Sequence, residues 1–479
     1  MTQIDRGTWL ALGAMGMAAF VLANDFSAIN VAIPQIEKDF DTSVTTTQWV
    51  VNAYALTFGV LLVTGGRLAD LFGRRRAFFV GTAIFAVFSV LGGLAQTEAE
   101  LIATRVVMGV GGALMWPAIL GMTFAALPED RAALGGAIIL GVCGLGNAAG
   151  PLIGGALTDL LSWRWIFFLN LPVSMLAAFV TWRELHQPRP DVDDTSIDYP
   201  GILTVSVGLV SLLLAFDQAI DWGWGDPRII GLISLFVVLM VAFALIERRQ
   251  GDRALVPPDV IQNRDFAYTC GAIVLMSAVF FASMLYLPQL MIKVYGWSAV
   301  GAGAGMLPMM ATFAAVSFSA GKLADKFGGK PLLVLGSLCI VLGAALIAIF
   351  SGQESYGAIV PGLAVLGLGI GLFYPTATTA GVTALDESRR SLAGAIIYMA
   401  QIAGGSVGLG ATTAIFVAAS DGATSGSGFV DGIQVAFGVD AAIAVGGFLI
   451  ATFLIGGRLH LPQMVRPAWA GHSPRGHGP

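Results

Sequence analysis

The sequence predicts an all-α, polytopic membrane protein, and three observations lead to this fold class. The chain of 479 residues is 56% hydrophobic and only 11% charged, whereas a soluble protein carries about 25% charged residues. Its apolar residues occur in runs long enough for a helix to cross a bilayer, which takes about 20 residues. These runs are continuous rather than alternating with polar residues, which excludes a membrane β-barrel.

Charge and cysteine content narrow the classes of function. The chain has 25 Lys and Arg against 30 Asp and Glu, a net charge of −5, so we expect no nucleic-acid partner. Cys143, Cys270 and Cys339 all fall inside apolar runs, which argues against a disulfide framework and against a metal cluster. We expect no cofactor and no metal, and no polar stretch is long enough to fold as a soluble domain.

The apolar runs predict fourteen transmembrane helices. They are expected at 9–33, 47–69, 77–96, 99–126, 134–161, 164–183, 200–217, 227–246, 266–292, 299–321, 331–351, 356–384, 391–419 and 432–456. The first run, Trp9–Ile33, is too long for a cleavable signal, and no small-residue cleavage site follows it. It is therefore expected to be a retained span.

The Lys and Arg residues predict the orientation, because cytoplasmic loops carry the excess of positive charge. With the N-terminus inside, Lys38, Arg164, Arg228 and Lys293 fall outside and Arg105 falls within a span. The other basic residues then lie on the cytoplasmic side. We therefore expect a multi-pass protein of the plasma (inner) membrane, surrounded by membrane lipids, with both termini in the cytoplasm.

An internal repeat relates the first and last thirds of the chain. Gly66–Gly73 (GRLADLFG) recurs as Gly321–Gly328 (GKLADKFG), and Gly136–Ile139 recurs as Gly394–Ile397. The matches occur in the same order and begin on the same membrane side, so the repeat is parallel. Parallel six-helix halves are typical of transporters whose substrate site lies near the midplane between the halves.

The repeat divides the chain into four parts. They are an N-terminal six-helix half (1–186), two inserted transmembrane helices with their linkers (187–265), a C-terminal six-helix half (266–457) and a cytoplasmic tail (458–479). We expect the chain to function as a monomer.

Two motifs resemble those of the major facilitator superfamily. Gly66–Arg76 resembles the signature between the second and third helices of that family, and Arg105–Gly112 resembles its fourth-helix motif. Met108 departs from the fourth-helix motif, which usually has Gln at this place. The resemblance covers nearly the whole chain and implies the major facilitator fold.

Further motifs resemble the fourteen-span drug:proton antiporters, the EmrB/QacA type of multidrug efflux transporter. Asp25–Pro34 is similar to their first-helix motif and Gly146–Gly155 to their fifth-helix motif, and Trp163–Pro172 also fits. Asp198–Gly201 comes before the inserted helices and Trp222–Gly225 lies between them, as in that branch. The resemblance implies proton-driven export of amphipathic compounds, including antibiotics.

Asp25 and Arg105 are the candidates for proton coupling. Asp25 lies about eight residues, or roughly 12 Å, below the outer end of the first span, and Arg105 lies about six residues from the outer end of the fourth. An intramembrane carboxylate is costly and is functional by default. We therefore expect a switchable pair in which Arg105 keeps Asp25 ionised until substrate or a conformational change releases it to bind a proton. The alternatives are a structural carboxylate and an arginine satisfied by backbone carbonyls.

The two copies of the repeated loop are candidate gates. They contribute Gly66, Asp70, Gly73 and Arg74 in the first half and Gly321, Asp325 and Gly328 in the second. Each Asp would accept hydrogen bonds from a facing helix N-terminus in one state and lose them in the other. The simpler interpretation is positive-inside anchoring with a tight turn at the glycine.

A glycine-rich run in the fifth span is a candidate pivot between the halves. It contains Gly146, Gly150, Pro151, Gly154 and Gly155. Small residues allow helices to approach closely, and a proline inside a helix bends it. Dense helix packing alone would explain the same pattern.

Polar and aromatic residues of the cavity-side helices are candidates for substrate binding. They are Asn24, Asn30, Asn52, Tyr54, Trp116, Asn147, Gln289, Tyr374, Tyr398 and Gln401. Aromatic faces suit cationic or planar ligands, although each residue is also explained by packing. Trp116 and Tyr374 occupy repeat-related positions and are expected to flank the cavity symmetrically. Asp440, in the last span, is a second acid, for which we expect a structural role or partial exposure.

These features predict a secondary active transporter that exchanges protons for an amphipathic or hydrophobic small molecule. An exporter of a lipid or endogenous metabolite with the same fold is the alternative within transport. A polytopic membrane enzyme is the alternative from another class, but the four histidines, His186, His460, His472 and His477, all fall in the linker or the tail. The sequence therefore favours a transporter over an enzyme.

Overall fold

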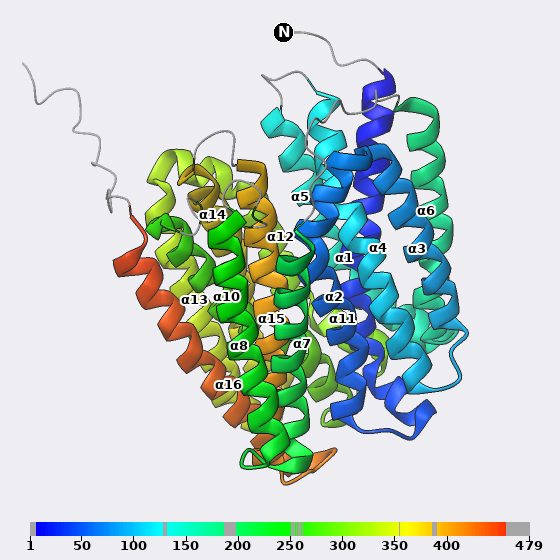
Figure 1. The fold of residues 1–479 in the computed structure, drawn as a ribbon. Coiled ribbons are helices and arrows are strands. Elements are labelled where there is room, and N and C mark those ends of the chain that lie inside the picture. Colours follow the sequence, from blue (N-terminus) through cyan, green and yellow to red (C-terminus); the bar gives the residue numbers. More distant parts are fainter. Residues whose placement is uncertain are drawn as a thin grey trace, which may run out of the picture.

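The computed structural model describes residues 6–127, 132–185, 198–250, 254, 256, 260, 262–353, 355–385 and 390–456. The predicted tail, 458–479, lies outside these residues. Every regular element in the described part of the chain is a helix (Figure 1). The expectation of an all-α protein is confirmed.

The helices follow the predicted spans in order. The N-terminal half contains α1 (Arg6–Phe40), α2 (Val44–Phe72), α3 (Arg74–Gly93), α4 (Glu98–Ala125), α5 (Ala132–Leu160) and α6 (Arg164–Glu184). The inserted pair is α7 (Tyr199–Trp222) and α8 (Pro227–Gln250). The C-terminal half contains α10 (Arg264–Lys293), α11 (Ala299–Gly305), α12 (Leu307–Phe327), α13 (Gly329–Phe350), the short turn η3 (Ser351–Gln353), α14 (Tyr356–Thr383), α15 (Arg390–Ser420), α16 (Gly426–Leu449) and its π-helical end η5 (Ile450–Leu454).

Thirteen described helices are long and apolar enough to cross a membrane. They account for all the predicted spans except 134–161, which corresponds to α5, a helix of 29 residues that is not among the thirteen. The multi-pass topology is therefore confirmed, and the count of fourteen spans stays a prediction.

The predicted span 299–321 differs in one respect, because it is interrupted. The helix stops after Gly305 and resumes at Leu307, with Met306 between the two segments. Pro308 lies in the first turn of α12, where its missing N–H and its ring prevent the preceding turn from continuing regularly. The break divides this span into α11 and α12.

Several helices begin at a side chain that satisfies a free backbone N–H of the first turn. Ser43 accepts from Thr46 N at 3.2 Å before α2, and Asn263 accepts from Phe266 N at 3.1 Å before α10. Asp198 does the same for α7, accepting from Gly201 N at 2.8 Å. These polar residues fix where the apolar runs start as helices.

The helices form two bundles that meet along a central seam (Figure 1). The helices α1–α6 lie on one side and α10 and α12–α16 on the other, whereas α11 packs against α5 of the first bundle. We call the end of the molecule at Arg6 the near end and the end at Phe40, where α1 stops, the far end. Within the inserted pair, α7 packs against α2 of one half and α15 of the other, whereas α8 packs against α7 and is otherwise exposed. The inserted pair therefore covers the seam from outside.

The repeated loops have the same backbone turn in both halves. Gly73, between α2 and α3, has φ 98°, and Gly328, between α12 and α13, has φ 87°. This region of φ is readily accessible only to glycine. The tight turn expected at both copies of the repeat is thus confirmed in the backbone.

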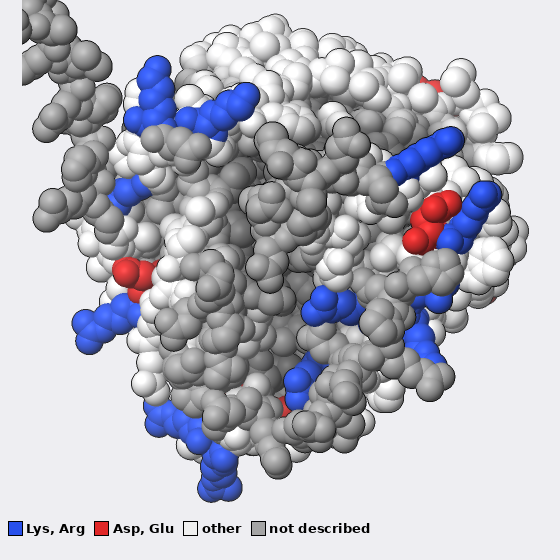
Figure 2. All heavy atoms as spheres, turned by 90° about the horizontal axis from the view of Figure 1, so that it is seen from above, with Lys and Arg blue, Asp and Glu red and all other residues white. Residues whose placement is uncertain are grey.

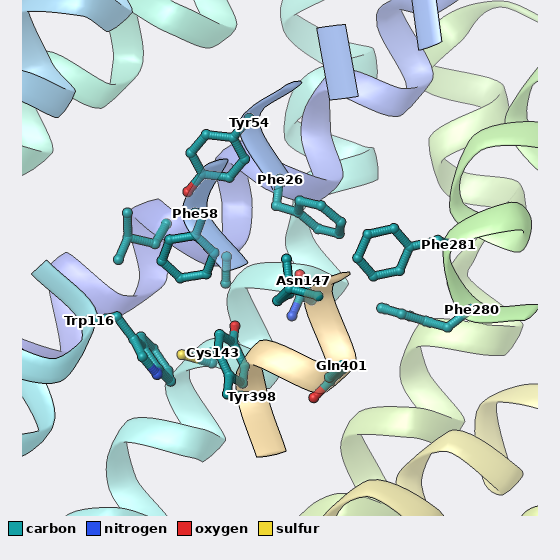
Figure 3. A pocket seen from close by; sticks show the side chains of 13 residues that line it. Phe26, Tyr54, Phe58, Trp116, Cys143, Asn147, Phe280, Phe281, Tyr398 and Gln401 are labelled. Carbon is teal, nitrogen blue, oxygen red and sulfur yellow. The ribbon is translucent and has the colours of Figure 1, made fainter. Parts of the chain in front are cut away.

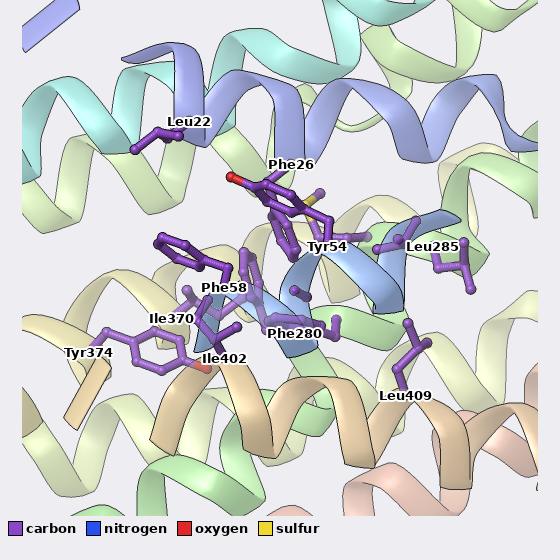
Figure 4. Close-up of a cluster of buried hydrophobic side chains, with 14 of the residues drawn as sticks. Leu22, Phe26, Tyr54, Phe58, Phe280, Leu285, Ile370, Tyr374, Ile402 and Leu409 are labelled. Carbon is purple, nitrogen blue, oxygen red and sulfur yellow. The ribbon is translucent and has the colours of Figure 1, made fainter. Parts of the chain in front are cut away.

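Large apolar side chains fill the seam (Figure 4). Leu22, Phe26 and Phe58 from the N-terminal half meet Phe280 and Ile402 from the C-terminal half. This packing joins the two halves around the region described next.

Candidate functional site

A buried ion pair occupies the N-terminal half. One terminal nitrogen of Arg105, on α4, donates to Oδ2 of Asp25, on α1, and both side chains are 0% exposed. The Arg105 Nε donates to the backbone oxygen of Val50 at 2.8 Å. Arg105 therefore both pairs with Asp25 and binds a backbone carbonyl, so the structure contains the predicted pair together with its structural alternative.

Asn170 of α6 completes the environment of the carboxylate. Its amide nitrogen donates to Asp25 Oδ1 at 2.8 Å and lies 3.0 Å from the hydroxyl of Ser89, on α3. The Ser89 hydroxyl donates to the Phe167 carbonyl at 2.8 Å. Each oxygen of Asp25 thus accepts from one side chain, and these contacts join α1, α3, α4 and α6.

Tyr54 of α2 connects the ion pair to a cavity. The Arg105 guanidinium carbon lies 4.3 Å from the centre of the Tyr54 ring, a cation–π contact. Tyr54 also lines a small cavity of about 40 Å³ in the seam. A ligand in this cavity would therefore be separated from the ion pair by a single aromatic ring.

The cavity is aromatic and is lined by both halves (Figure 3). Its wall consists of Leu22, Ala23, Phe26, Tyr54, Phe58, Trp116, Cys143, Asn147, Phe280, Phe281, Tyr398, Gln401 and Ile402. None of these lining residues carries a formal charge at neutral pH. The wall therefore provides apolar surface and aromatic faces, with amide groups from Asn147 and Gln401.

Ring contacts across the cavity join the halves. Trp116 of α4 stacks on Tyr398 of α15 with ring centres 4.9 Å apart, and Phe58 meets the same Tyr398 edge to face at 5.9 Å. Phe26 contacts Phe281 at 4.9 Å. Any movement of one half against the other must therefore change the shape of this wall.

Half of the predicted substrate-binding residues line this cavity. They are Tyr54, Trp116, Asn147, Tyr398 and Gln401. Asn24, Asn30, Asn52 and Gln289 are buried but are not among the lining residues.

The expected symmetry of Trp116 and Tyr374 is absent from the lining. Trp116 lines the cavity, whereas Tyr374 does not. Its ring packs against Phe280, which does line the cavity, and its hydroxyl lies 3.1 Å from that of Ser277. Tyr374 therefore lies one layer behind the wall.

Two kinds of residue in the site were not predicted from the sequence. Asn170 lies about six residues after the start of α6, at the same depth as Arg105 in α4. The depth arithmetic that paired Arg105 with Asp25 therefore identifies Asn170 as well. Phe280 and Phe281 gave no such signal, because a cavity-lining phenylalanine and a core phenylalanine look the same in sequence.

The predicted gating residues occur where the repeat places them. Arg74 donates to the Gly121 carbonyl of α4 at 3.1 Å, and Gly66 lies beside Pro117 of the same helix. Gly321 is exposed in α12. The side chains of Asp70 and Asp325 lie outside the described part of the structure.

The glycine run of α5 is a close-packing surface. A Cβ on Gly154 would lie 2.3 Å from the Ala28 oxygen, and Gly146 and Gly150 also face α1. Gly155 faces the other half, where a Cβ would lie 2.4 Å from the Ala299 oxygen of α11. Pro151 also faces α11, since a Cβ on Gly303 would meet its carbonyl oxygen at 2.1 Å. The small residues thus allow α5 to pack closely against α1 of its own half and against α11 of the other half.

Polar contacts join the halves at the far end. Lys293 of α10 pairs with Glu37 of α1 at 2.6 Å, with side chains 11% and 13% exposed. The Asp159 carboxylate of α5 accepts from the backbone nitrogens of Ala299 and Val300 at 3.1 and 2.8 Å. These contacts and the glycine packing close the far end of the seam.

Asp440 is fully buried in α16, so the expectation of partial exposure is wrong. Its Oδ1 accepts from the Thr412 hydroxyl of α15 at 2.7 Å. The helix lies at the side of the bundle, but Asp440 is on its inner face.

Known proteins resemble this chain over most of its length. Residues 15–409 match the family model described as Major Facilitator Superfamily. A puromycin resistance protein of Streptomyces alboniger is 33% identical over 94% of this chain and 91% of its own length. The multidrug resistance protein Stp of Mycobacterium tuberculosis is 30% identical (87% and 78%), and the cephamycin export protein CmcT of Amycolatopsis lactamdurans is 32% identical (86% and 84%).

Proposed function

The chain belongs to the major facilitator superfamily, and on this premise we propose that it is a proton-coupled antiporter that exports amphipathic small molecules. It is a multi-pass membrane transporter rather than an enzyme. Its similarity to antibiotic resistance and export proteins supports drug-like cargo.

The observation that carries the proposal is the buried Asp25–Arg105 pair, one aromatic ring away from an uncharged cavity. A carboxylate in the membrane interior is expensive unless it is paired or protonated. Because Arg105 and Asn170 hold its two oxygens here, Asp25 binds a proton only when those donors move.

Tyr54 supplies the link between cargo and proton. A ligand that displaces the Tyr54 ring also disturbs the face that covers the Arg105 guanidinium. Arg105 then shifts toward the Val50 carbonyl that it already binds, and Asp25 becomes free to protonate. Return of Arg105 to Asp25 releases the proton, so cargo and proton occupy the site in alternation.

The cavity defines the chemistry of the cargo. The uncharged, aromatic wall suits a planar apolar molecule or an organic cation, and the small cavity must widen to admit it. Sites for such ligands are usually apolar with a few oriented polar groups, which Asn147 and Gln401 provide here.

For the orientation, we propose that the near end faces the cytoplasm of a plasma (inner) membrane. Figure 2 views the molecule from this end and shows more Lys and Arg than Asp and Glu side chains among the described residues. Cytoplasmic loops carry such an excess. The closed far end then faces outward, and the chain works as a monomer within the lipid.

The test is transport in proteoliposomes with an imposed pH gradient and a clamped membrane potential. Cationic dyes, neutral drugs and lipids are compared as cargo. Each coupled proton supports at most a tenfold cargo gradient per pH unit, so the wild type is expected to accumulate a preferred dye up to tenfold per coupled proton at one pH unit. Uptake that is independent of the pH gradient would argue against antiport.

Asp25→Asn is expected to abolish accumulation but to retain counterflow, the exchange of labelled for unlabelled cargo. The matched control is Asp41→Asn, an exposed acid just beyond the same helix whose positive φ of 50° asparagine tolerates. If Asp25→Asn accumulates dye as the wild type does, the assigned role of Asp25 is wrong.

A further inference from the structure

We propose that Asp440 is a second proton-binding carboxyl, reached from the far end along a hydrogen-bonding row on α10. This inference rests on the proposed antiport and names a second residue of the coupling. It would give each six-helix half one such group, Asp25 in the first and Asp440 in the second.

The two buried acids differ in their partners. Both oxygens of Asp25 accept hydrogen bonds, one of them from Arg105. Asp440 is also 0% exposed, but only its Oδ1 has a partner, the Thr412 hydroxyl, and its Oδ2 has none among the described residues. A buried charge without a counter-charge is costly and is relieved by protonation. These contacts favour a protonated Asp440 in the state in which Asp25 is ionised.

The helices packed around Asp440 bring one titratable group toward it. These helices are α10, α13 and α15. Tyr286 of α10 is near enough to interact electrostatically with both Asp440 and Glu37. Its hydroxyl donates to Thr413, the neighbour of Thr412, at 2.7 Å.

The other titratable groups on these helices make different contacts or lie elsewhere. Lys293 pairs with Glu37, Lys330 donates to the Ile455 carbonyl, Asp265 accepts from Gly456, and Tyr398 lines the cavity. The remaining described ones are Arg264, Tyr268, Cys270 and Cys339, with Asp431 exposed on α16 itself. Among the described residues, no Lys or Arg forms an ion pair with Asp440.

A row of polar side chains on α10 connects this group to the far end. Tyr286, Gln289 and Lys293 are spaced at three and four residues, which places them on one face of the helix. Gln289 is fully buried, and neither its amide oxygen nor its nitrogen has a partner among the described residues. A buried amide in this condition is a natural site for an internal water.

Protons move along this row by exchange. Water at the far end enters beside the Glu37–Lys293 pair, and a water on Gln289 passes a proton to the Tyr286 hydroxyl. Each hydroxyl takes up one proton and releases its own, through Thr413 and its chain neighbour Thr412, and Thr412 passes a proton to Asp440 Oδ1, the oxygen to which it donates. No group is oxidised or reduced, and one proton enters at the far end for each proton that Asp440 binds.

The prediction is a change in coupling ratio. With one neutral cargo molecule exchanged for two protons, one pH unit supports about a hundredfold gradient, and with one proton it supports about tenfold. Asp440→Asn keeps an oxygen that accepts from Thr412 but removes the proton site. We expect the gradient to fall about tenfold relative to wild type in proteoliposomes with a clamped potential, while counterflow is retained.

Asp431→Asn, an exposed acid on the same helix, is the matched control and is expected to behave as wild type. If Asp440→Asn supports the same gradient as wild type, Asp440 is structural and the proposal fails.

A second measurement does not depend on transport. Infrared spectra of the wild type are expected to contain the C=O stretch of a buried protonated carboxyl, and Thr412→Val is expected to shift this band because it removes the donor to Asp440. This comparison decides the matter if Asp440→Asn fails to fold. A spectrum without such a band, or a band that Thr412→Val leaves unmoved, overturns the proposal. If the wild type shows no pH-driven accumulation, the antiport proposal fails, and the infrared result still decides the state of Asp440.

Discussion

The ion pair between Asp25 and Arg105 makes a quantitative prediction about stability. Asp25→Asn and Arg105→Gln each leave one buried charge without its partner, whereas the double variant leaves none. Because both side chains are 0% exposed, solvent does not screen the remaining charge. We therefore expect the double variant to lose less stability than the sum of the two single variants.

The magnitude follows from the contacts that each single variant keeps. Breaking a buried pair by removing one partner costs about 3–5 kcal/mol. In Asp25→Asn, Arg105 keeps the Val50 carbonyl at 2.8 Å and the face of Tyr54 at 4.3 Å, so we expect a loss near 3 kcal/mol. In Arg105→Gln, Asp25 keeps only Asn170, so we expect a loss near 5 kcal/mol at neutral pH.

The two single variants should also differ in their pH dependence. In Arg105→Gln, protonation of the carboxylate at low pH removes the unpaired buried charge and with it the cost of that charge. Stability relative to wild type therefore rises as the pH falls. Arginine stays protonated at all accessible pH values, so the deficit of Asp25→Asn should show no such recovery.

The assay is a double-mutant cycle, measured by SDS-induced unfolding in mixed micelles. We expect a coupling energy of about 3 kcal/mol between Asp25 and Arg105. A control cycle with Asp431→Asn in place of Arg105→Gln should be additive to within about 0.5 kcal/mol, because Asp431 is exposed on α16. Additive losses for the Asp25–Arg105 cycle would show that the two charges do not stabilise each other, which would refute the reasoning.

Three further predictions concern the packing, the far end and the cavity. Gly154→Ala should lose about 1–3 kcal/mol of unfolding free energy, because its Cβ would lie 2.3 Å from a backbone oxygen of α1, whereas Gly144→Ala, with open space, should lose none. Lys293→Ala removes an ion pair of about 1 kcal/mol that helps to close the far end, so it should speed thiol labelling of a cysteine placed at Gln289 about fivefold; an unchanged rate would show that the pair does not limit access from the far end. Trp116→Ala should weaken binding of a cationic dye about tenfold by fluorescence titration, and unchanged affinity would place the dye elsewhere.

The sequence determined the parts of this protein that depend on local chemistry and on periodicity. Scarce charge and long apolar runs define the helices, because a backbone in lipid must satisfy its own hydrogen bonds. The pairing of Asp25 with Arg105 was also predictable, since two charges at one depth in lipid must find each other. The depth arithmetic alone would also have identified Asn170, an uncharged amide at the same level.

The tertiary structure decided which residues meet across the seam. Phe280 and Phe281 line the cavity while Tyr374 lies behind it, and no periodicity separates these roles because all three are buried aromatic residues. The far-end pair of Glu37 and Lys293 joins residues that are distant in the chain, so only the arrangement of the halves reveals it.

Asp440 shows the difference most clearly. Its place in a helix at the side of the bundle suggested exposure, but the rotation of α16 turns it inward against Thr412. Sequence gives the depth of a residue along its helix, whereas the direction in which it points depends on the packing of every neighbouring helix. The sequence therefore determines the depth of each charged residue in the membrane. The packing of the helices decides which of these residues have partners.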